Sequence, residues 1–157
     1  MRFVDLGHPI RPQMPVFPSV LKTFVGVYRG HTESLRPGGV SSQTNIIVMS
    51  DHAGTHVDAP SHLLHLDRGA ITDFCPADFV GPCVVADLRH KTDDDEIGPA
   101  DFEPYRDLLA PGDILLLATG WSRFQGGMSL SNADEERWMH HSPYLSKDGA
   151  EWICARG

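Results

Sequence analysis

The segment 50–65 holds the residues of this sequence that are best suited to chemistry. Four of the nine histidines fall within it, at His52, His56, His62 and His65. His52, His56 and Asp58 are spaced as H-x3-H-x-D, and two imidazoles with one carboxylate form a donor set that suits Zn²⁺, Mn²⁺ or Fe²⁺. Three protein ligands leave coordination positions open, which a metal needs to activate water. The alternative is a surface or capping pair of histidine and aspartate.

The local sequence favours an extended chain for this segment. A helix is disfavoured by Gly54, Thr55, Val57 and Pro60. Because alternate side chains of an extended chain share a face, we expect His56, Asp58 and the later His62 on one side and the two β-branched residues on the other, directed into the protein. A turn at 51–54 then returns His52 to the same side.

The first third of the sequence predicts strands and loops that carry this segment. Short β-type runs occur at 3–6, 23–28 and 44–50, and stretches rich in proline and glycine separate them.

A strand, helix and strand follow in the middle of the sequence. The run 79–88 predicts a buried strand, and 99–109 predicts a helix with Pro99 in its first turn, although Pro104 weakens that helix. The run 114–120 predicts a fully buried strand. Together they indicate a βαβ unit.

The remaining elements are a loop, a turn and a helix. We predict a long loop with at most one helical turn over 121–141, and a solvated turn in the acidic run 92–98. A last helix is predicted from its cap at Ser146 to a stop at Gly157.

Composition indicates one globular domain that binds a small molecule. The 157 residues are 41% hydrophobic and 22% charged, which is ordinary for a folded domain of this length. The net charge of −8 repels phosphate groups, so we expect neither nucleic acid nor an anionic membrane as a partner.

The ends and the cysteines of the sequence indicate a cytoplasmic protein. No signal peptide and no run of about 20 apolar residues is found. Three cysteines without a C-x-x-C pair predict reduced, mostly structural thiols, so a bound metal is expected to use nitrogen and oxygen ligands.

The motif H-A-G-T-H-V-D-A-P-S-H at 52–62 resembles the H-x-G-T-H-x-D-x-P-x-H signature of the cyclase-like metal-dependent hydrolases. This family includes bacterial kynurenine formamidase and isatin hydrolase. The similarity extends over nearly the whole chain, through DLGHPI, MPVFP, FVGPCVVADL, ILLLATGW and LSKDGAEWI. It implies an α/β fold of the swivelling β/β/α type, a mixed sheet with a few helices, as one domain over 1–157.

The resemblance also assigns roles within the motif. It implies that His52, His56 and Asp58 bind a divalent metal, Zn²⁺ first and Mn²⁺ second, and that His62 is the general acid/base. These roles suit the residue types, since a histidine that stays off the metal can move protons near neutral pH.

By resemblance, water activated by the metal attacks the carbonyl of a small-molecule amide. The first substrate expected is N-formylkynurenine, which gives kynurenine and formate, and cyclic amides such as isatin are the alternative. A homodimer or a higher homo-oligomer is also implied.

Relatives of this family continue beyond the last helix with a strand, a histidine and a glutamate, so the resemblance implies a C-terminally shortened chain. A metal-binding remnant without catalysis is therefore a second hypothesis, and a metal-free binding domain a third. His140 and His141 are candidate replacement ligands, for which we prefer a loop or packing role.

Overall fold

A computed structural model of the protein describes residues 4–65, 67–124 and 132–156. The chain forms two compact units, Met1–Asp58 and Ala59–Gly157. The prediction of one domain stays a prediction.

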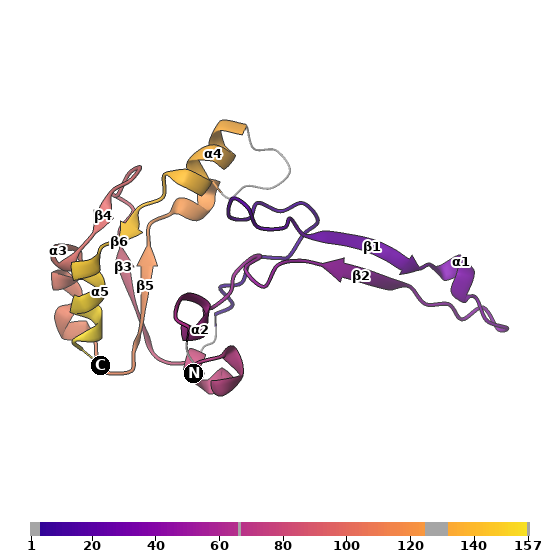
Figure 1. Cartoon of the computed structure of the whole chain (residues 1–157), viewed down its shortest axis with the longest axis horizontal. Helices are drawn as coiled ribbons and strands as arrows, with labels where there is room; N and C mark the ends of the chain where they lie inside the picture. Colours follow the sequence, from indigo (N-terminus) through magenta and orange to yellow (C-terminus); the bar gives the residue numbers. More distant parts are fainter. Residues whose placement is uncertain (1–3, 66, 125–131, 157) are drawn as a thin grey trace. The chain divides into compact units, whose positions relative to one another are not determined.

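The first unit contains a β-hairpin (Figure 1). Its elements are β1 (Phe24–Arg29), α1 (His31–Ser34) and β2 (Thr44–Val48). The strands pair antiparallel, from Phe24 opposite Val48 to Val27 opposite Asn45, and a register shift follows between Val27 and Arg29. Two of the three strands predicted here are therefore confirmed.

The predicted strand at 3–6 is wrong over its described residues. Residues 4–6 have no regular structure, and Phe3 lies outside the described residues. Val4 and Leu6 are 65% and 58% exposed, so the apolar pattern that suggested a strand is not buried against a sheet.

A small apolar core anchors the loop that follows β2. Met14, Val16 and Ala53 are buried, and Val20 and Met49 pack against them. Because Ala53 belongs to this core, the residues on either side of it are held in place by apolar contacts.

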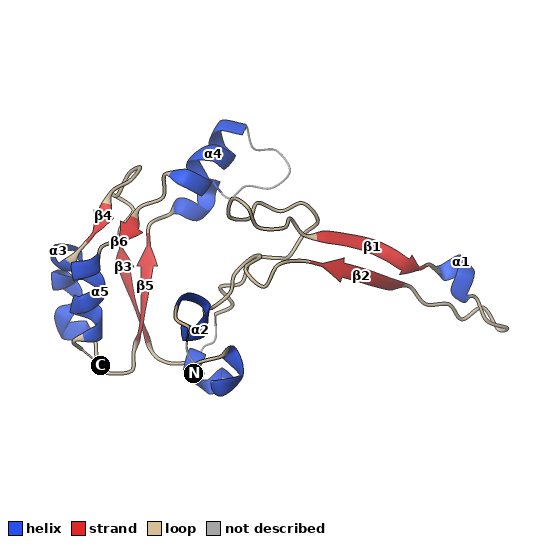
Figure 2. Cartoon of the chain, viewed as in Figure 1, coloured by secondary structure: helices blue, strands red, loops and turns tan. Residues whose placement is uncertain are grey.

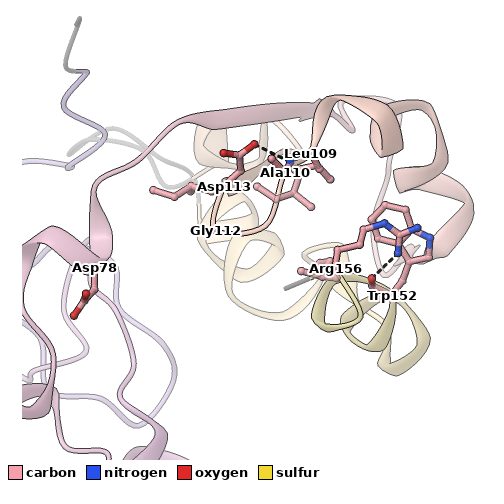
Figure 3. Close-up of a pocket in the computed structure, with 10 residues that line it drawn as sticks. Asp78, Leu109, Ala110, Gly112, Asp113, Trp152 and Arg156 are labelled. Carbon is pink, nitrogen blue, oxygen red and sulfur yellow. Dashed lines mark hydrogen bonds between the residues drawn. The ribbon is translucent and has the colours of Figure 1, made fainter.

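The second unit contains a parallel strand pair (Figure 2). Its strands are β3 (Cys83–Asp87), β4 (Glu96–Ile97), β5 (Ile114–Ala118) and β6 (Tyr144–Leu145). Its α-helices are α2 (Pro60–Leu63), α3 (Pro99–Phe102), α4 (Asn132–His140) and α5 (Lys147–Cys154). Its 3-10 helices are η1 (Ile71–Asp73), η2 (Pro76–Phe79), η3 (Glu103–Leu108) and η4 (Trp121–Phe124).

The predicted βαβ unit is confirmed. Strands β3 and β5 run parallel, with Cys83 opposite Ile114 and Asp87 opposite Ala118, and α3 with η3 lies between them in the chain. Strands β4 and β6 form a second parallel pair. The core of this unit consists of Ala86, Leu88, Ile97 and Phe102, with Tyr105, Leu115, Leu117, Trp152 and Ile153 packed against it.

Three predictions for this unit need correction. The helix predicted over 99–109 is α-helical only to Phe102 and continues as the 3-10 helix η3, because Pro104 has no N–H for an α-helical hydrogen bond. Strand β5 is half-buried rather than fully buried. The strand predicted to be buried over 79–88 is only partly buried. Val85 in β3 is 52% exposed, because in the described residues β3 and β5 form a sheet of only two strands.

The long loop predicted over 121–141 is also wrong in its described part. Helices η4 and α4 occupy it, and residues 125–131 lie outside the described residues. The Arg137 guanidinium carbon lies 5.2 Å from the ring centre of Trp121 and 4.4 Å from that of Phe124. These contacts stabilise a helix whose apolar periodicity is weak.

The last helix and the acidic turn are largely as predicted. Ser146 caps α5 by accepting a hydrogen bond from the backbone N–H of Gly149, while the predicted stop at Gly157 lies outside the described residues. The acidic run forms a turn at 93–94, but its end adds strand β4.

The class prediction of α/β is confirmed. In the described part of the chain the strands form three two-stranded sheets, one antiparallel and two parallel. None of the described helices has the length and apolar character of a transmembrane span. The cysteines Cys75, Cys83 and Cys154 are free, as predicted, although all three are exposed.

Candidate metal centre

The candidate metal centre lies on the loop that leaves β2. The chain turns at Asp51 and His52, and Gly54 has a φ of +79°, in the left-handed region that favours glycine. The predicted turn at 51–54 is therefore present, and buried Ala53 fixes its middle.

The turn brings together one atom from each predicted ligand. His52 Nδ1 lies 3.2 Å from His56 Nε2 and 3.0 Å from Asp58 Oδ1. His56 Nε2 lies 3.4 Å from the same carboxylate oxygen. The imidazole rings meet edge to face, with centroids 5.1 Å apart.

These separations fit a divalent ion. Bonds of about 2.0–2.2 Å from a tetrahedral ion place neighbouring donor atoms about 3.3–3.6 Å apart. The three atoms already approach that arrangement. Among the described residues, His52, His56 and Asp58 form a group of side chains that could hold a metal ion. The side chains of His52, His56 and Asp58 are 24%, 32% and 49% exposed, so water can reach the cluster.

Backbone and side-chain groups support the two imidazoles. His56 Nδ1 lies 2.8 Å from the carbonyl oxygen of Gly54, and His52 Nε2 lies 3.8 Å from Asp51 Oδ1. The Ser50 hydroxyl accepts from the backbone N–H of His52 at 3.1 Å and donates to Asp51 Oδ1. That donation, and then the nearby His52, hold the pKa of Asp51 below its ordinary value.

Sequence reasoning missed Ser50, whose hydroxyl accepts from the backbone N–H of His52, as a support of the site. The signal was a serine followed by an aspartate at the start of a turn, a position where such side chains bond to nearby backbone groups.

The prediction of an extended strand around His56 and Asp58 is wrong. Residues 56–59 are not part of a strand, and Val57 is 49% exposed instead of directed into the protein. A turn and an irregular segment, rather than the alternation of a strand, place His56 and Asp58 together.

His62 lies on α2, in the second unit, and is exposed. The short helix begins at Pro60, whose fixed φ suits the first helical position. The role of His62 as general acid/base stays a prediction.

The other candidate histidines make contacts of their own. His141 Nδ1 lies 2.9 Å from Asp94 Oδ2, and this carboxylate raises the pKa of His141. His140 lies 3.9 Å from Glu136 on the same helix. These contacts favour the loop or packing role over metal binding.

Comparison with known proteins gives the same family as the motif. The Cyclase family model matches residues 4–157. The kynurenine formamidase of Sphingopyxis alaskensis is 30% identical over 102 residues, which are 64% of this chain and 46% of that protein. The kynurenine formamidase of Salinibacter ruber is 33% identical over 92 residues, 57% of this chain and 40% of that protein. The chain thus spans less than half of these curated relatives.

A solved structure agrees with this similarity. Isatin hydrolase A from Labrenzia aggregata, bound to benzyl benzoate, superposes with a TM-score of 0.77 at 26% identity, over 99% of this chain and 64% of that one. The matches in family model, sequence and structure lead to one conclusion: the chain belongs to the Cyclase family.

Proposed function

We propose that this protein is a metal-dependent amidohydrolase. The observation that carries the proposal is the convergence of His52 Nδ1, His56 Nε2 and Asp58 Oδ1, within 4.8 Å of one another, on a loop that water can reach. Two imidazoles and one carboxylate would hold the ion, Zn²⁺ in first place and Mn²⁺ in second. When bound, such an ion lowers the pKa of a water ligand and polarises a carbonyl group.

The chain's own residues would supply the ligands and a proton carrier. Asp58 contributes a negative charge that offsets the charge of a divalent cation, and both histidines bind through neutral nitrogens. His62 would carry a proton on an imidazole nitrogen and deliver it to the departing nitrogen of the amide.

The relatives support two substrate classes. Two kynurenine formamidases match the sequence, so N-formylkynurenine, hydrolysed to kynurenine and formate, is the first substrate to test. Isatin hydrolase A matches in structure, so cyclic amides of the isatin type are the second.

The test is metal content and turnover in matched variants. We expect His56→Ala to lose the metal, because the ion then keeps only two protein ligands. His62→Ala is expected to keep the metal and to lose turnover by a factor of about 100 or more. The controls are His31→Ala, at an exposed histidine of the first unit beside Ser41 Oγ, and His140→Ala in the second unit.

The outcomes separate the hypotheses. Equal metal content in wild type and His56→Ala would contradict the ligand assignment. A wild type that binds metal but hydrolyses no formyl-anilide, cyclic imide or lactam would be a metal-binding protein without this activity.

A further inference from the structure

We propose that Gly54 is a positioning residue of the metal centre, whose backbone carbonyl fixes the ring of His56. This inference rests on the proposed metal-binding role of His52, His56 and Asp58. It adds a group that binds neither metal nor substrate.

The hydrogen bond selects one tautomer of His56. The Gly54 carbonyl oxygen lies 2.8 Å from His56 Nδ1, and a carbonyl can only accept, so Nδ1 must carry the proton. The lone pair of the neutral ring is then on Nε2. This nitrogen is the one that lies 3.2 Å from His52 Nδ1 and 3.4 Å from Asp58 Oδ1.

The backbone of Gly54 directs this carbonyl. The acceptor is only two residues before His56, so the chain must turn sharply to reach the ring, and the φ of +79° at Gly54 is part of that turn. A residue with a Cβ adopts this φ with difficulty.

Space around Gly54 is not what requires a glycine. A Cβ built there would lie 3.6 Å from Ile10 Cγ1 and 3.6 Å from Met14 Cε, which are ordinary contacts. An alanine at position 54 therefore changes the backbone preference and leaves the packing intact.

The Gly54 carbonyl lies closer to its imidazole than the Asp51 carboxylate lies to His52. Asp51 Oδ1 lies 3.8 Å from His52 Nε2, beyond hydrogen-bond distance, whereas the Gly54 contact is short. Groups that orient a metal-binding histidine typically change metal affinity by about 10–100-fold when they are lost.

The experiment compares metal affinity in three variants. Zn²⁺ or Co²⁺ dissociation constants are measured by competition with a chelator for Gly54→Ala, Gly54→Asn and Gly39→Ala. Gly39 is a matched control, since it has the same φ of +79° in the same unit and no atom within 4 Å of its Cβ position. Thermal unfolding of the metal-free proteins reports the backbone cost of each change.

We expect Gly54→Ala to weaken metal binding by about 10–100-fold and Gly39→Ala to leave it unchanged. Gly54→Asn should recover most of the affinity, because asparagine tolerates the left-handed region. Equal affinity in wild type and Gly54→Ala, or equal losses in Gly54→Ala and Gly39→Ala, would overturn the inference.

A second measurement needs no metal. The ¹⁵N chemical shifts of His56 in the metal-free protein, at a pH where the ring is neutral, should show the Nδ1-protonated tautomer in wild type and a mixture in Gly54→Ala. The same Nε2-protonated form in both would overturn the inference. Failure of wild type to bind any metal, with the tautomer as expected, would instead contradict the proposed function.

Discussion

Glu103 links helix η3 to α5 through its carboxylate. Its Oε1 accepts from the indole N–H of Trp152 at 2.9 Å, and its Oε2 accepts from Arg106 Nε at 2.7 Å. Arg106 first, and Trp152 second, lower the pKa of Glu103 to about 2. Because Glu103 accepts these hydrogen bonds as a carboxylate, both of them are expected to be present at neutral pH.

We predict that the stabilisation from Glu103 depends on pH. A carboxylate with a lowered pKa stabilises the fold above its ordinary pKa of 4.5, and this stabilisation is lost as the pH falls toward about 2. Glu103→Gln should therefore unfold more easily than wild type at pH 7, and the difference should shrink between pH 4.5 and pH 2. Urea unfolding at several pH values measures it.

The control is Glu151→Gln, at an exposed glutamate whose oxygen lies 3.6 Å from Lys147 Nζ. Exposed pairs of this kind contribute little, so we expect almost no change at any pH. A constant difference between wild type and Glu103→Gln over the whole range would contradict the prediction.

At the scale of elements, the predictions that hold depend mainly on residues close together in the sequence. Residue types over short stretches indicate the turn at 51–54 and the cap of α5 at Ser146. The order strand, helix, strand indicates the parallel pair β3–β5. The grouping of His52, His56 and Asp58 was also predictable, because their spacing and the turn at 51–54 lie within eight residues.

Elements held by distant contacts could not be predicted in the same way. Helix α4 has weak apolar periodicity and depends on Arg137, whose Nε donates to Asp93 Oδ1 at 2.8 Å, 44 positions away in the chain. The hydrogen bond between Gly54 and His56 depends on a φ value, which residue types at these positions allow but do not specify.

We predict that Arg137→Lys loosens α4. Lysine keeps the charge but lacks the planar guanidinium that stacks on Trp121 and Phe124 while pairing with Asp93. A loss of about 1 kcal/mol in the free energy of opening this helix is expected. Hydrogen exchange of residues 134–140 measures it, with Arg36→Lys, an exposed arginine of the first unit, as control.

The hydrogen-exchange comparison has a clear negative outcome. If residues 134–140 exchange at the same rate in wild type and Arg137→Lys, the aromatic stack does not hold α4. The polar sequence of the helix would then have to be sufficient for its stability.

At the scale of the whole molecule, the β1–β2 hairpin presents apolar side chains on both faces. Ile46 and Val48 share the face of Phe24, and Val27 and Ile47 lie on the other, with exposed fractions between 41% and 61%. A two-stranded hairpin is marginally stable alone, and strands that are apolar on both faces are usually covered.

We therefore expect the protein to form a homo-oligomer, a dimer or tetramer, through this hairpin. Val27→Lys should shift sedimentation toward the monomer, because a charge on an apolar contact is costly to bury. Gln43→Lys, at an exposed polar position next to β2, is the control and should sediment as wild type does. Identical sedimentation of wild type and Val27→Lys would rule out this face as the contact.

Metal binding should stabilise the first unit in particular. All three proposed ligands lie between Ser50 and Ala59, and Ala53 between them belongs to the core formed with Met14 and Val16. An ion that binds only the folded loop at 100 times its dissociation constant stabilises it by about 2.7 kcal/mol. Added Zn²⁺ should therefore slow hydrogen exchange in 50–58 and in that core, while exchange in β3 and β5 stays nearly unchanged. His56→Ala should show no such protection, and protection spread evenly over both units, or retained in that variant, would show that the ion acts elsewhere.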